Sequence, residues 1–347
     1  MVVDFRTRKS SNPLDRYILS FFHNTPLRAF ALQPSKAKQR FGFKVSLKDR
    51  PTTRRGILSK VSSLYDPLGF LAPFILVAKV LLQGICQKGL AWDDPVDEKD
   101  LQTWQEWLDD LPRLTEIKIP RCLKPEVLGD QVLYHYQLHY FCDASELGYA
   151  AVAYLRIVDS AGRIHCSFVC GKSRLSPLKV TSIPRLELAA AVLAVDMDHM
   201  IQEELRLPIA TTTFWTDSTS VLMYIQNESR RFHTFVANKV AKIREATELS
   251  QWRHVNTKLN PADDGSRGLK AQELITNPRW LSGPDFLKQE EENWPSSPAI
   301  LGELKKDDLE VKKDRVHVNT VVTKDSVQEL LTKSNDQKDR SNGRISW

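Results

Sequence analysis

The sequence contains no Cys-x-x-Cys pair, although it has five cysteines, at positions 86, 122, 142, 166 and 170. An odd number of cysteines without such a pair argues against a secreted disulfide scaffold and against a zinc ribbon. Cys166 and Cys170 lie four positions apart in an apolar run, and we expect both to be small packing residues.

Long apolar runs are absent as well. The N-terminus carries charges at Asp4 and Arg6 and lacks the apolar centre of a signal peptide. The longest apolar stretch, residues 70–82, is interrupted by Pro73 and Lys79 and is too short to span a bilayer. Together with the cysteine pattern, these absences predict an intracellular protein, cytoplasmic or nuclear, without a membrane segment.

Acidic residues are scarce in residues 1–60, which hold 14 Lys and Arg against 3 Asp, a net charge of +11 in a chain whose total is +6. Such a basic segment can steer a polyanion, and nucleic acid is the obvious candidate. A solvated, partly disordered arm explains the same composition. Both interpretations remain open.

Helical spacing of apolar residues marks the first half of the chain. It predicts helices over residues 54–65, 73–87 and 98–111, with a strand-like alternation earlier, at residues 41–45. Trp104 and Trp107 share one face of the third helix, and this spacing is more typical of a core than of a base-stacking surface.

Residues 131–270 predict an α/β fold. The expected order is two strands within 131–155 joined by a turn at 146–148, a strand at 165–169, a helix at 184–205, a strand at 213–217, helices at 218–226 and 232–248, a strand at 251–255, and a last helix beginning at Asp263. Hairpin-linked strands followed by alternating helices and strands predict a mixed sheet with helices packed on it.

The resulting domain prediction has five segments and no internal repeats. They are a basic, weakly ordered segment (1–50), a helical region (51–130), the α/β domain (131–270), a spacer (271–302) and a charged tail expected to be disordered (303–347).

Four acidic residues stand at the ends of the predicted elements. Asp143 and Asp217 each end a strand-like run, where α/β sheets usually bind their ligands. Glu187 lies in the first turns of the long helix, and Asp263 begins the last helix after a proline-containing loop. If the two strands are neighbours, these carboxylates meet at one edge of the sheet.

Carboxylates gathered in this way are the hard oxygen ligands that magnesium prefers, and two such ions can hold both sides of an in-line phosphoryl displacement. Each acid has a simpler explanation as a cap or turn residue, and Asp217 before Ser218 suits a helix N-cap. Four acids in this order on these elements favour the metal site, and hence metal-dependent cleavage of a nucleic-acid backbone.

The motifs around these acids resemble a known family. Residues 141–145 (FCDAS), 183–188 (IPRLEL), 215–218 (WTDS), 260–263 (NPAD) and 266–268 (SRG) are similar to the ribonuclease H domain of Pao/BEL-type LTR retrotransposon polyproteins. Residues 54–61 (RRGILSKV) and 65–69 (YDPLG) resemble the connection between reverse transcriptase and ribonuclease H, and residues 280–284 (WLSGP) resemble the spacer before the integrase. The resemblance covers roughly residues 40–295. It implies a ribonuclease H-like mixed five-stranded sheet with flanking helices, preceded by a small helical connection region.

The resemblance also implies an activity and roles for the acids. The activity is cleavage of RNA in RNA–DNA hybrids with two Mg²⁺ ions, or Mn²⁺ in their place, and the polyprotein partners are reverse transcriptase and integrase. Asp143 would bridge both metals, Glu187 and Asp217 would complete one side, and Asp263 would bind the second ion, with Asp264 as its adjacent competitor. The metals would orient the attacking water and stabilise the leaving 3′ oxygen.

Further residues receive roles by the same resemblance. His254 corresponds to a family histidine that assists proton transfer or product release, although a strand-end histidine needs no such role. Contacts to the nucleic-acid backbone are expected from these residues: Ser145, Lys172, Arg174, Arg185 and Ser218.

Two motifs of related proteins are missing. The sequence has no Tyr-x-Asp-Asp, the reverse transcriptase centre, and no His/Cys zinc pattern after Trp294, so we expect a fragment of such an element or a genomic copy of one. The family is also called Pao retrotransposon peptidase, but the Asp-Ser/Thr-Gly of aspartic proteases is absent, and the nearest string is Asp217-Ser218-Thr219. The alternatives to a nuclease are a catalytically silent nucleic-acid-binding relic and, less favoured, an aspartic peptidase.

Overall fold

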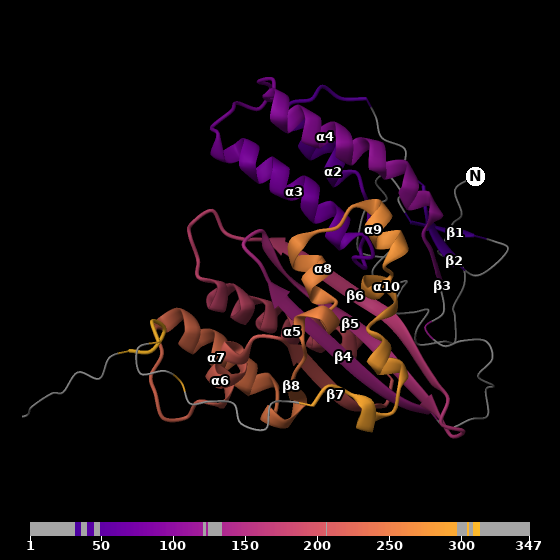
Figure 1. Cartoon of the computed structure of the whole chain (residues 1–347), viewed down its shortest axis with the longest axis vertical. Helices are drawn as coiled ribbons and strands as arrows, with labels where there is room; N and C mark the ends of the chain where they lie inside the picture. The colour runs from indigo at the N-terminus through magenta and orange to yellow at the C-terminus, as the bar shows by residue number, and fades with distance from the viewer. Residues whose placement is uncertain are drawn as a thin grey trace, which may run out of the picture.

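The computed structural model describes residues 32–35, 40–44, 49–120, 123, 134–205, 207–296, 304 and 308–312. A five-stranded sheet forms the centre of the molecule, with helices on both faces (Figure 1). Its strands are β4 Tyr134–Ala144, β5 Gly148–Asp159, β6 Ile164–Leu175, β7 Ile209–Thr216 and β8 Trp252–His254. The helices after β6 are α5 Ile183–Leu205, α6 Thr219–Gln226, α7 Thr234–Ala246, α8 Ala262–Arg267, α9 Ala271–Thr276 and α10 Arg279–Ser282.

The strand order is β6-β5-β4-β7-β8, with β4 in the middle. β4, β5 and β6 are antiparallel neighbours, as hairpin connections dictate, whereas β7 and β8 run parallel to β4 because helices separate them in the chain. This confirms the predicted mixed five-stranded sheet with flanking helices. β6 extends to Leu175, well beyond the predicted end at residue 169, because it stays paired with β5 along its whole length.

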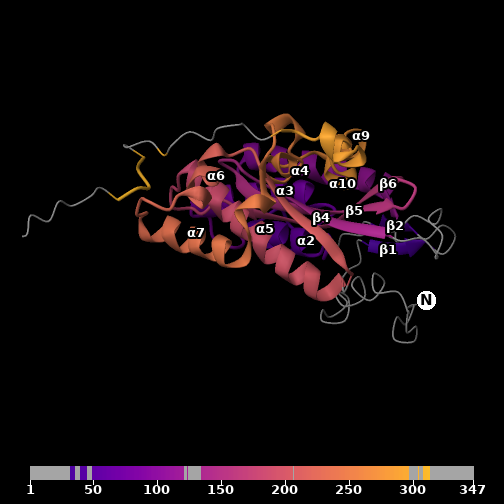
Figure 2. The same ribbon diagram turned by 90° about the horizontal axis from the view of Figure 1, so that it is seen from below.

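The two faces of the sheet are covered by different helices (Figures 1 and 2). α5 packs on β4 and β5 from one side with α7 beside it, and its buried positions are small or aliphatic, among them Leu188 and Ala191. α8 packs on β4 and β5 from the other side. Such close packing on both faces explains why the middle of β4, from Leu138 to Cys142, is almost completely buried.

The region before the sheet contains α2 Arg54–Ser62, α3 Ala72–Gln87, α4 Glu98–Asp110, the 3₁₀ turn η2 Leu111–Glu116 and a small sheet of β1 Leu32–Ser35, β2 Arg40–Phe43 and β3 Lys118–Pro120. The three predicted helices are therefore present. Trp104 and Trp107 are buried and stacked with ring centroids 4.9 Å apart, which confirms their expected place in the core.

The helical region rests directly on the main sheet. Gly69, in the left-handed conformation with φ +76°, brings the chain so close to β6 that a Cβ at this position would lie 1.8 Å from the carbonyl oxygen of Gly171. The Gly171 N–H donates to the Leu68 carbonyl at 2.8 Å. These contacts tie the connection between α2 and α3 to the edge strand.

Residues 271–296 contain more packed structure than their weak periodicity indicates. Besides α9 and α10 they form the short turns η5 Asp285–Lys288 and η6 Glu291–Asn293, which follow η3 Leu249–Gln251 and η4 Thr257–Leu259. Trp280 is fully buried, and its indole N–H donates to the Gly69 carbonyl at 3.1 Å. In the part of the chain that the structure describes, no helix combines the length and the apolar character needed to cross a bilayer.

Candidate active site at the ends of strands β4 and β7

Asp143 and Asp217 are brought together by the pairing of two parallel strands. Cys142 on β4 lies opposite Thr216 on β7, so the next residue of each strand is one of these acids. Parallel strands end at the same edge of a sheet, and the two carboxyl groups are near enough for a hydrogen bond between them when one carries a proton. The predicted meeting of strand-end carboxylates is therefore present in the structure.

Glu187 reaches the same edge from α5. Its Oε2 accepts a hydrogen bond from the Ser218 hydroxyl at 2.6 Å, and this hydroxyl also caps α6 by accepting from the Val221 N–H at 3.1 Å. Ser218, which directly follows Asp217, thus fixes Glu187 beside the end of β7.

The two acids of α8 have different surroundings. Asp263 accepts from Arg267 Nε at 2.5 Å and contributes to the electrostatic field at Asp143. Asp264 is buried and accepts two hydrogen bonds from Arg279, at 2.6 and 3.0 Å. The pair with Arg279 occupies both Asp264 oxygens, so the geometry favours Asp263 over Asp264 as the fourth acid of the site.

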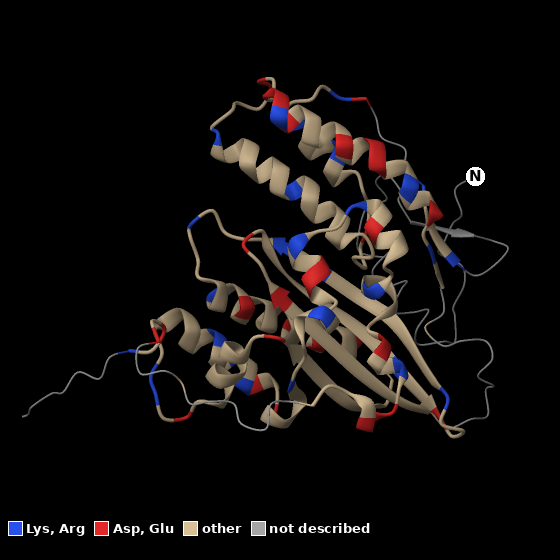
Figure 3. Cartoon of the chain, in the orientation of Figure 1, with Lys and Arg blue, Asp and Glu red and all other residues tan. Residues whose placement is uncertain are grey.

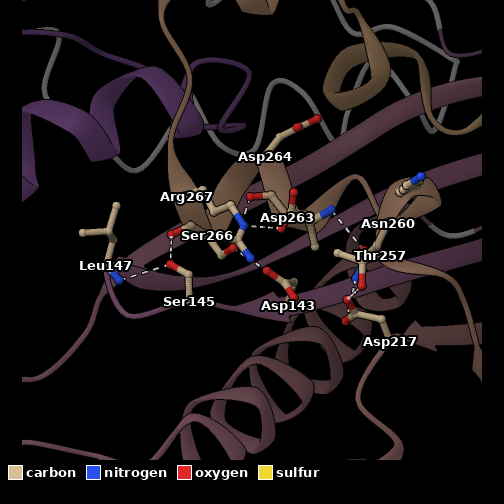
Figure 4. A network of polar contacts seen from close by, with 12 residues as sticks. Asp143, Ser145, Leu147, Asp217, Thr257, Asn260, Asp263, Asp264, Ser266 and Arg267 are labelled. Carbon is tan, nitrogen blue, oxygen red and sulfur yellow. Dashed lines mark hydrogen bonds and ion pairs between the residues drawn. The ribbon is translucent and has the colours of Figure 1, made fainter.

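Three side chains that the sequence did not single out hold these acids in place (Figure 4). Ser266 on α8 donates to Asp143 Oδ2, and Thr257 donates to Asp217 Oδ2 at 2.5 Å. Asn260 is completely buried, and its amide donates both to the Cys142 carbonyl at 3.1 Å and to Asp217 Oδ1 at 3.2 Å. Two of them, Asn260 and Ser266, lie inside the motifs quoted above, but their partners follow only from the docking of α8 on the sheet.

Burial and the crowding of like charges both raise the pKa values of acids in the site. Burial, together with the charges of Asp217 and Asp263, raises the pKa of Asp143 to about 7, although the hydrogen bond from Ser266 opposes this shift. Burial also raises the pKa of Glu187, the charge of Asp217 adds to the effect, and the Ser218 hydrogen bond opposes it. Such a set of acids is stabilised by any positive charge placed among them.

The donor set fits a hard divalent cation in kind and in number, since it offers up to eight carboxylate oxygens from four acids. Arg267 shows the attraction directly, because its guanidinium interacts with the charges of Asp263, Asp143 and Asp217. Over the described ranges, no group of three or more His, Cys, Asp or Glu side chains has the arrangement of a metal site as it stands. Oxygens that now accept from Ser266, Thr257 or Arg267 would have to turn to a cation.

The other predicted residues lie around this edge with various partners. His254 on β8 is opposite Thr216 and so flanks the end of β7. Ser145 is buried, donates to the Ser266 carbonyl at 2.7 Å and accepts from the Leu147 N–H at 3.1 Å, so its hydroxyl serves the hairpin turn. Its contact with nucleic acid, like that of Ser218, stays a prediction.

The three predicted basic contacts differ in their availability. Lys172 and Arg174 lie on β6, where Lys172 is half-buried and Arg174 is exposed. Arg185, at the start of α5, forms an ion pair at 2.8 Å with Glu310, a residue of the segment that the sequence predicted to be a disordered tail. Residue 310 of that segment therefore lies against the start of α5.

The strand order, the helices on both faces and the acids at the end of the central strands define a ribonuclease H-like fold. Residues 53–218 match the model of the family described as Pao retrotransposon-like RNaseH-like domain. The resemblance to the ribonuclease H-like region of Pao/BEL retrotransposons is thereby confirmed over these residues, which include Asp143, Glu187 and Asp217. None of the curated proteins matches this chain in sequence.

Solved structures with this fold are similar at low identity. The N-terminal RNase H domain of Rv2228c from Mycobacterium tuberculosis, solved as a fusion with maltose binding protein, is 10% identical with a TM-score of 0.26, covering 40% of this chain and 99% of that one. RNase H1 from Halobacterium salinarum NRC-1 is 13% identical with a TM-score of 0.24, covering 41% and 98%. LC11-RNase H1, solved in complex with an RNA/DNA hybrid, is 15% identical with a TM-score of 0.24, covering 37% and 91%. The fold assignment rests on the strand order and on the family match.

Proposed function

We propose that this chain is a ribonuclease H-type endonuclease that cleaves the RNA strand of RNA–DNA hybrids with two Mg²⁺ ions, as part of a retrotransposon pol polyprotein with reverse transcriptase and integrase parts. The observation that carries the proposal is the convergence of Asp143 and Asp217 at the ends of paired parallel strands, with Glu187 and Asp263 joining them. A structural role alone gives no reason to bury one carboxylate beside others until its pKa rises to about 7.

Each residue has a part in the proposed reaction. Asp143, Glu187, Asp217 and Asp263 supply the oxygens that hold the ions, or Mn²⁺ in their place. Bound divalent ions lower the pKa of the attacking water and stabilise charge on the leaving 3′ oxygen. Asn260 holds the Asp217 carboxylate through Oδ1 before any ligand arrives, which reduces the reorganisation that the reaction requires.

Proton transfer and substrate positioning belong to the surrounding residues. His254 lies on β8 opposite Thr216, the residue before Asp217, and we assign to it the movement of a proton at the departing product. Lys172, Arg174 and Arg185, with Ser145 and Ser218, are the proposed contacts to phosphates and sugars, which position a nucleic acid without reading its sequence.

A panel of labelled substrates of one sequence tests the proposal. The RNA–DNA hybrid, the RNA duplex and the DNA duplex are each incubated with the full chain in Mg²⁺ and in EDTA. We expect cleavage of the RNA strand in the hybrid alone, in Mg²⁺ alone, with products that end in a 3′ hydroxyl. A hybrid that is bound and stays intact in Mg²⁺ would identify the silent relic, and EDTA-resistant proteolysis at acidic pH would identify the peptidase.

A further inference from the structure

Residues 308–312, here called the acidic strap, contact the segment before α7 and the helices α5 and α6, although they are far from all three in sequence. They run beside α7 in both views (Figures 1 and 2). Val311 forms an antiparallel bridge with Phe232. The Glu310 carbonyl accepts from the His233 N–H at 2.9 Å, and the Lys312 N–H donates to the Arg231 carbonyl at 2.7 Å. The strap is thus paired with the backbone that precedes α7.

The acids of the strap occupy donors at the start of α5 and at the end of α6. Both oxygens of Glu310 accept from Arg185 Nε, at 2.8 and 2.9 Å, and the Ser182 hydroxyl donates to Oε1 at 3.2 Å. The Tyr224 hydroxyl donates to Asp308 at 3.1 Å. Only 7% of the Glu310 side chain is exposed, so the carboxylate is enclosed by these donors.

These donors belong to the two helices that hold Glu187. Arg185 precedes Glu187 by two residues on α5, and Tyr224 lies on α6, whose N-cap Ser218 donates to Glu187. The Tyr224 hydroxyl feels the charge of Glu187 as well as that of Asp308. The strap therefore contacts both of the helices that hold Glu187.

A carboxylate on arginine occupies the place that a phosphate oxygen takes in nucleic-acid recognition, because both acceptors present the same oxygen geometry to the guanidinium. The attachment of the strap is mainly polar: Leu309 is 89% exposed, and Val311 alone among its residues adds apolar packing. A competing polyanion can replace these polar contacts with its own, and the displaced strap exposes little apolar area to water.

We propose that the acidic strap is an autoinhibitory segment: Glu310 occupies Arg185 in place of a backbone phosphate, and nucleic acid must displace the strap to reach this part of the site. The inference rests on the proposed function, because it takes nucleic acid as the ligand of this surface. It adds a regulatory contact made by the chain's own residues, and anything that removes the charge of the strap or pulls it away increases access to the site.

Binding of a labelled RNA–DNA hybrid to the full chain in magnesium-free buffer tests the strap without requiring cleavage. Glu310→Gln removes the ion pair, and Glu292→Gln removes the same charge at an exposed position of η6. We expect Glu310→Gln to tighten binding about three- to tenfold relative to Glu292→Gln. In an Arg185→Gln background, Glu310→Gln should bring no such gain, because the donor that the strap covers is gone.

Hydrogen exchange of the unmodified chain provides a second measurement that no folding defect of a variant can disturb. The amides of His233 and Lys312 hold the strap through their backbone hydrogen bonds, and both should exchange faster when saturating hybrid is present. Unchanged or slower exchange at both amides would contradict displacement of the strap.

The outcomes separate the strap from the proposed function. Equal hybrid affinity of the Glu310→Gln and Glu292→Gln variants would contradict autoinhibition by the strap, and so would a gain in affinity that persists in the Arg185→Gln background. Neither result would affect the nuclease proposal. Hybrid that binds by displacing the strap but is never cut in Mg²⁺ would overturn the nuclease and keep the strap. Absence of binding by every variant would overturn both.

Discussion

Asp143 is the most enclosed of the four acids, with 6% of its surface exposed. The negative charges of Asp217 and Asp263 both act on its carboxyl group. In the unfolded chain its carboxyl ionises at the ordinary value near 4, whereas the folded protein retains the proton up to about pH 7. Between these values the folded state binds more protons, so its stability falls as the pH rises. Above about pH 7 Asp143 is ionised in the metal-free folded protein, and this loss of folding stability is complete.

Asp143→Asn is therefore expected to stabilise the metal-free protein at high pH. The free energy of unfolding in EDTA should exceed that of the wild type by on the order of 2 kcal/mol at pH 8, and the difference should shrink toward zero at pH 4. Denaturant titrations of both proteins at these two pH values measure it. A variant that is no more stable than the wild type at pH 8 would show that burial and the neighbouring acids do not destabilise the ionised Asp143.

Asp263 and Asp264 are adjacent and yet should respond oppositely to the same substitution. Asp263→Asn removes an acid of the site and should lower hybrid cleavage by about 100-fold or more, with little loss of stability. Asp264→Asn weakens the enclosed pair with Arg279 and should lower the free energy of unfolding by about 1–3 kcal/mol while cleavage remains measurable at a temperature where the variant is folded. Rates and denaturation midpoints of the two variants, compared side by side, test the assignment, and the reverse pattern would transfer the role to Asp264.

Among the elements, α8 decides whether the acids meet, since it carries Asp263 and Ser266 and packs on β4 and β5. Its close approach depends on Gly265, where a Cβ would lie 2.7 Å from the Ala150 Cβ and 2.7 Å from the Trp280 ring. A larger residue must push the helix away from the sheet or from α10.

Gly265→Ala is expected to cost about 1–3 kcal/mol of stability and to lower hybrid cleavage, because α8 shifts together with Asp263 and Ser266. Gly84→Ala is the matched control: it lies inside α3, where a Cβ would have no neighbour within 4 Å, and it should stabilise the protein by up to about 1 kcal/mol with unchanged cleavage. Thermal melting and initial rates of both variants check this. Equal effects of the two substitutions would contradict the role given to α8 packing.

The elements that carry Asp143, Asp217 and Glu187 could be predicted because their signals are local. An acid stands at or directly after the end of each of the strand-like runs of β4 and β7, and α5 has a proline as its second residue, followed by small apolar residues. The hydrogen bonds of Asn260 and Ser266 could not be predicted, because they form only when α8 docks on the sheet. Their partners on β4 lie 118 and 123 residues earlier in the chain, and the partner after β7 lies 43 residues earlier. The packing of the segment after Gly268 could not be predicted for a similar reason: its buried aromatic residues follow no helical or strand period, and long-range contacts fix their places.

At the scale of the whole molecule, the helical region and the sheet share one core. Besides the contact at Gly69, the Leu269 N–H donates to the Pro73 carbonyl at 3.3 Å, and the Ala271 N–H donates to Asp110 at 2.5 Å. Acidic residues predominate on α4, so this region offers no basic surface of its own along that helix (Figure 3). The basic residues 1–31 lie outside the part of the chain that the structure describes, and their role as an arm for nucleic acid stays a prediction.

We predict that α2–α4 and the main sheet unfold in one transition. Calorimetry in EDTA should give a single peak whose calorimetric and van't Hoff enthalpies agree. Trp280→Phe, which leaves the Gly69 carbonyl without its donor, should lower the midpoint of this peak, with a loss of about 1–3 kcal/mol, and should not split it. Two separate peaks in the wild type would instead describe the helical region as an independent unit.

The initial rate of RNA–DNA hybrid cleavage in Mg²⁺ tests most directly whether the acids at the ends of β4 and β7 form a nuclease site. The wild type is compared with Asp217→Asn and with Asp285→Asn, which makes the same change at a side chain that is 89% exposed. We expect Asp217→Asn to lose at least about 100-fold in rate and Asp285→Asn to retain the wild-type rate. Cleavage by Asp217→Asn at the wild-type rate would contradict the nuclease site.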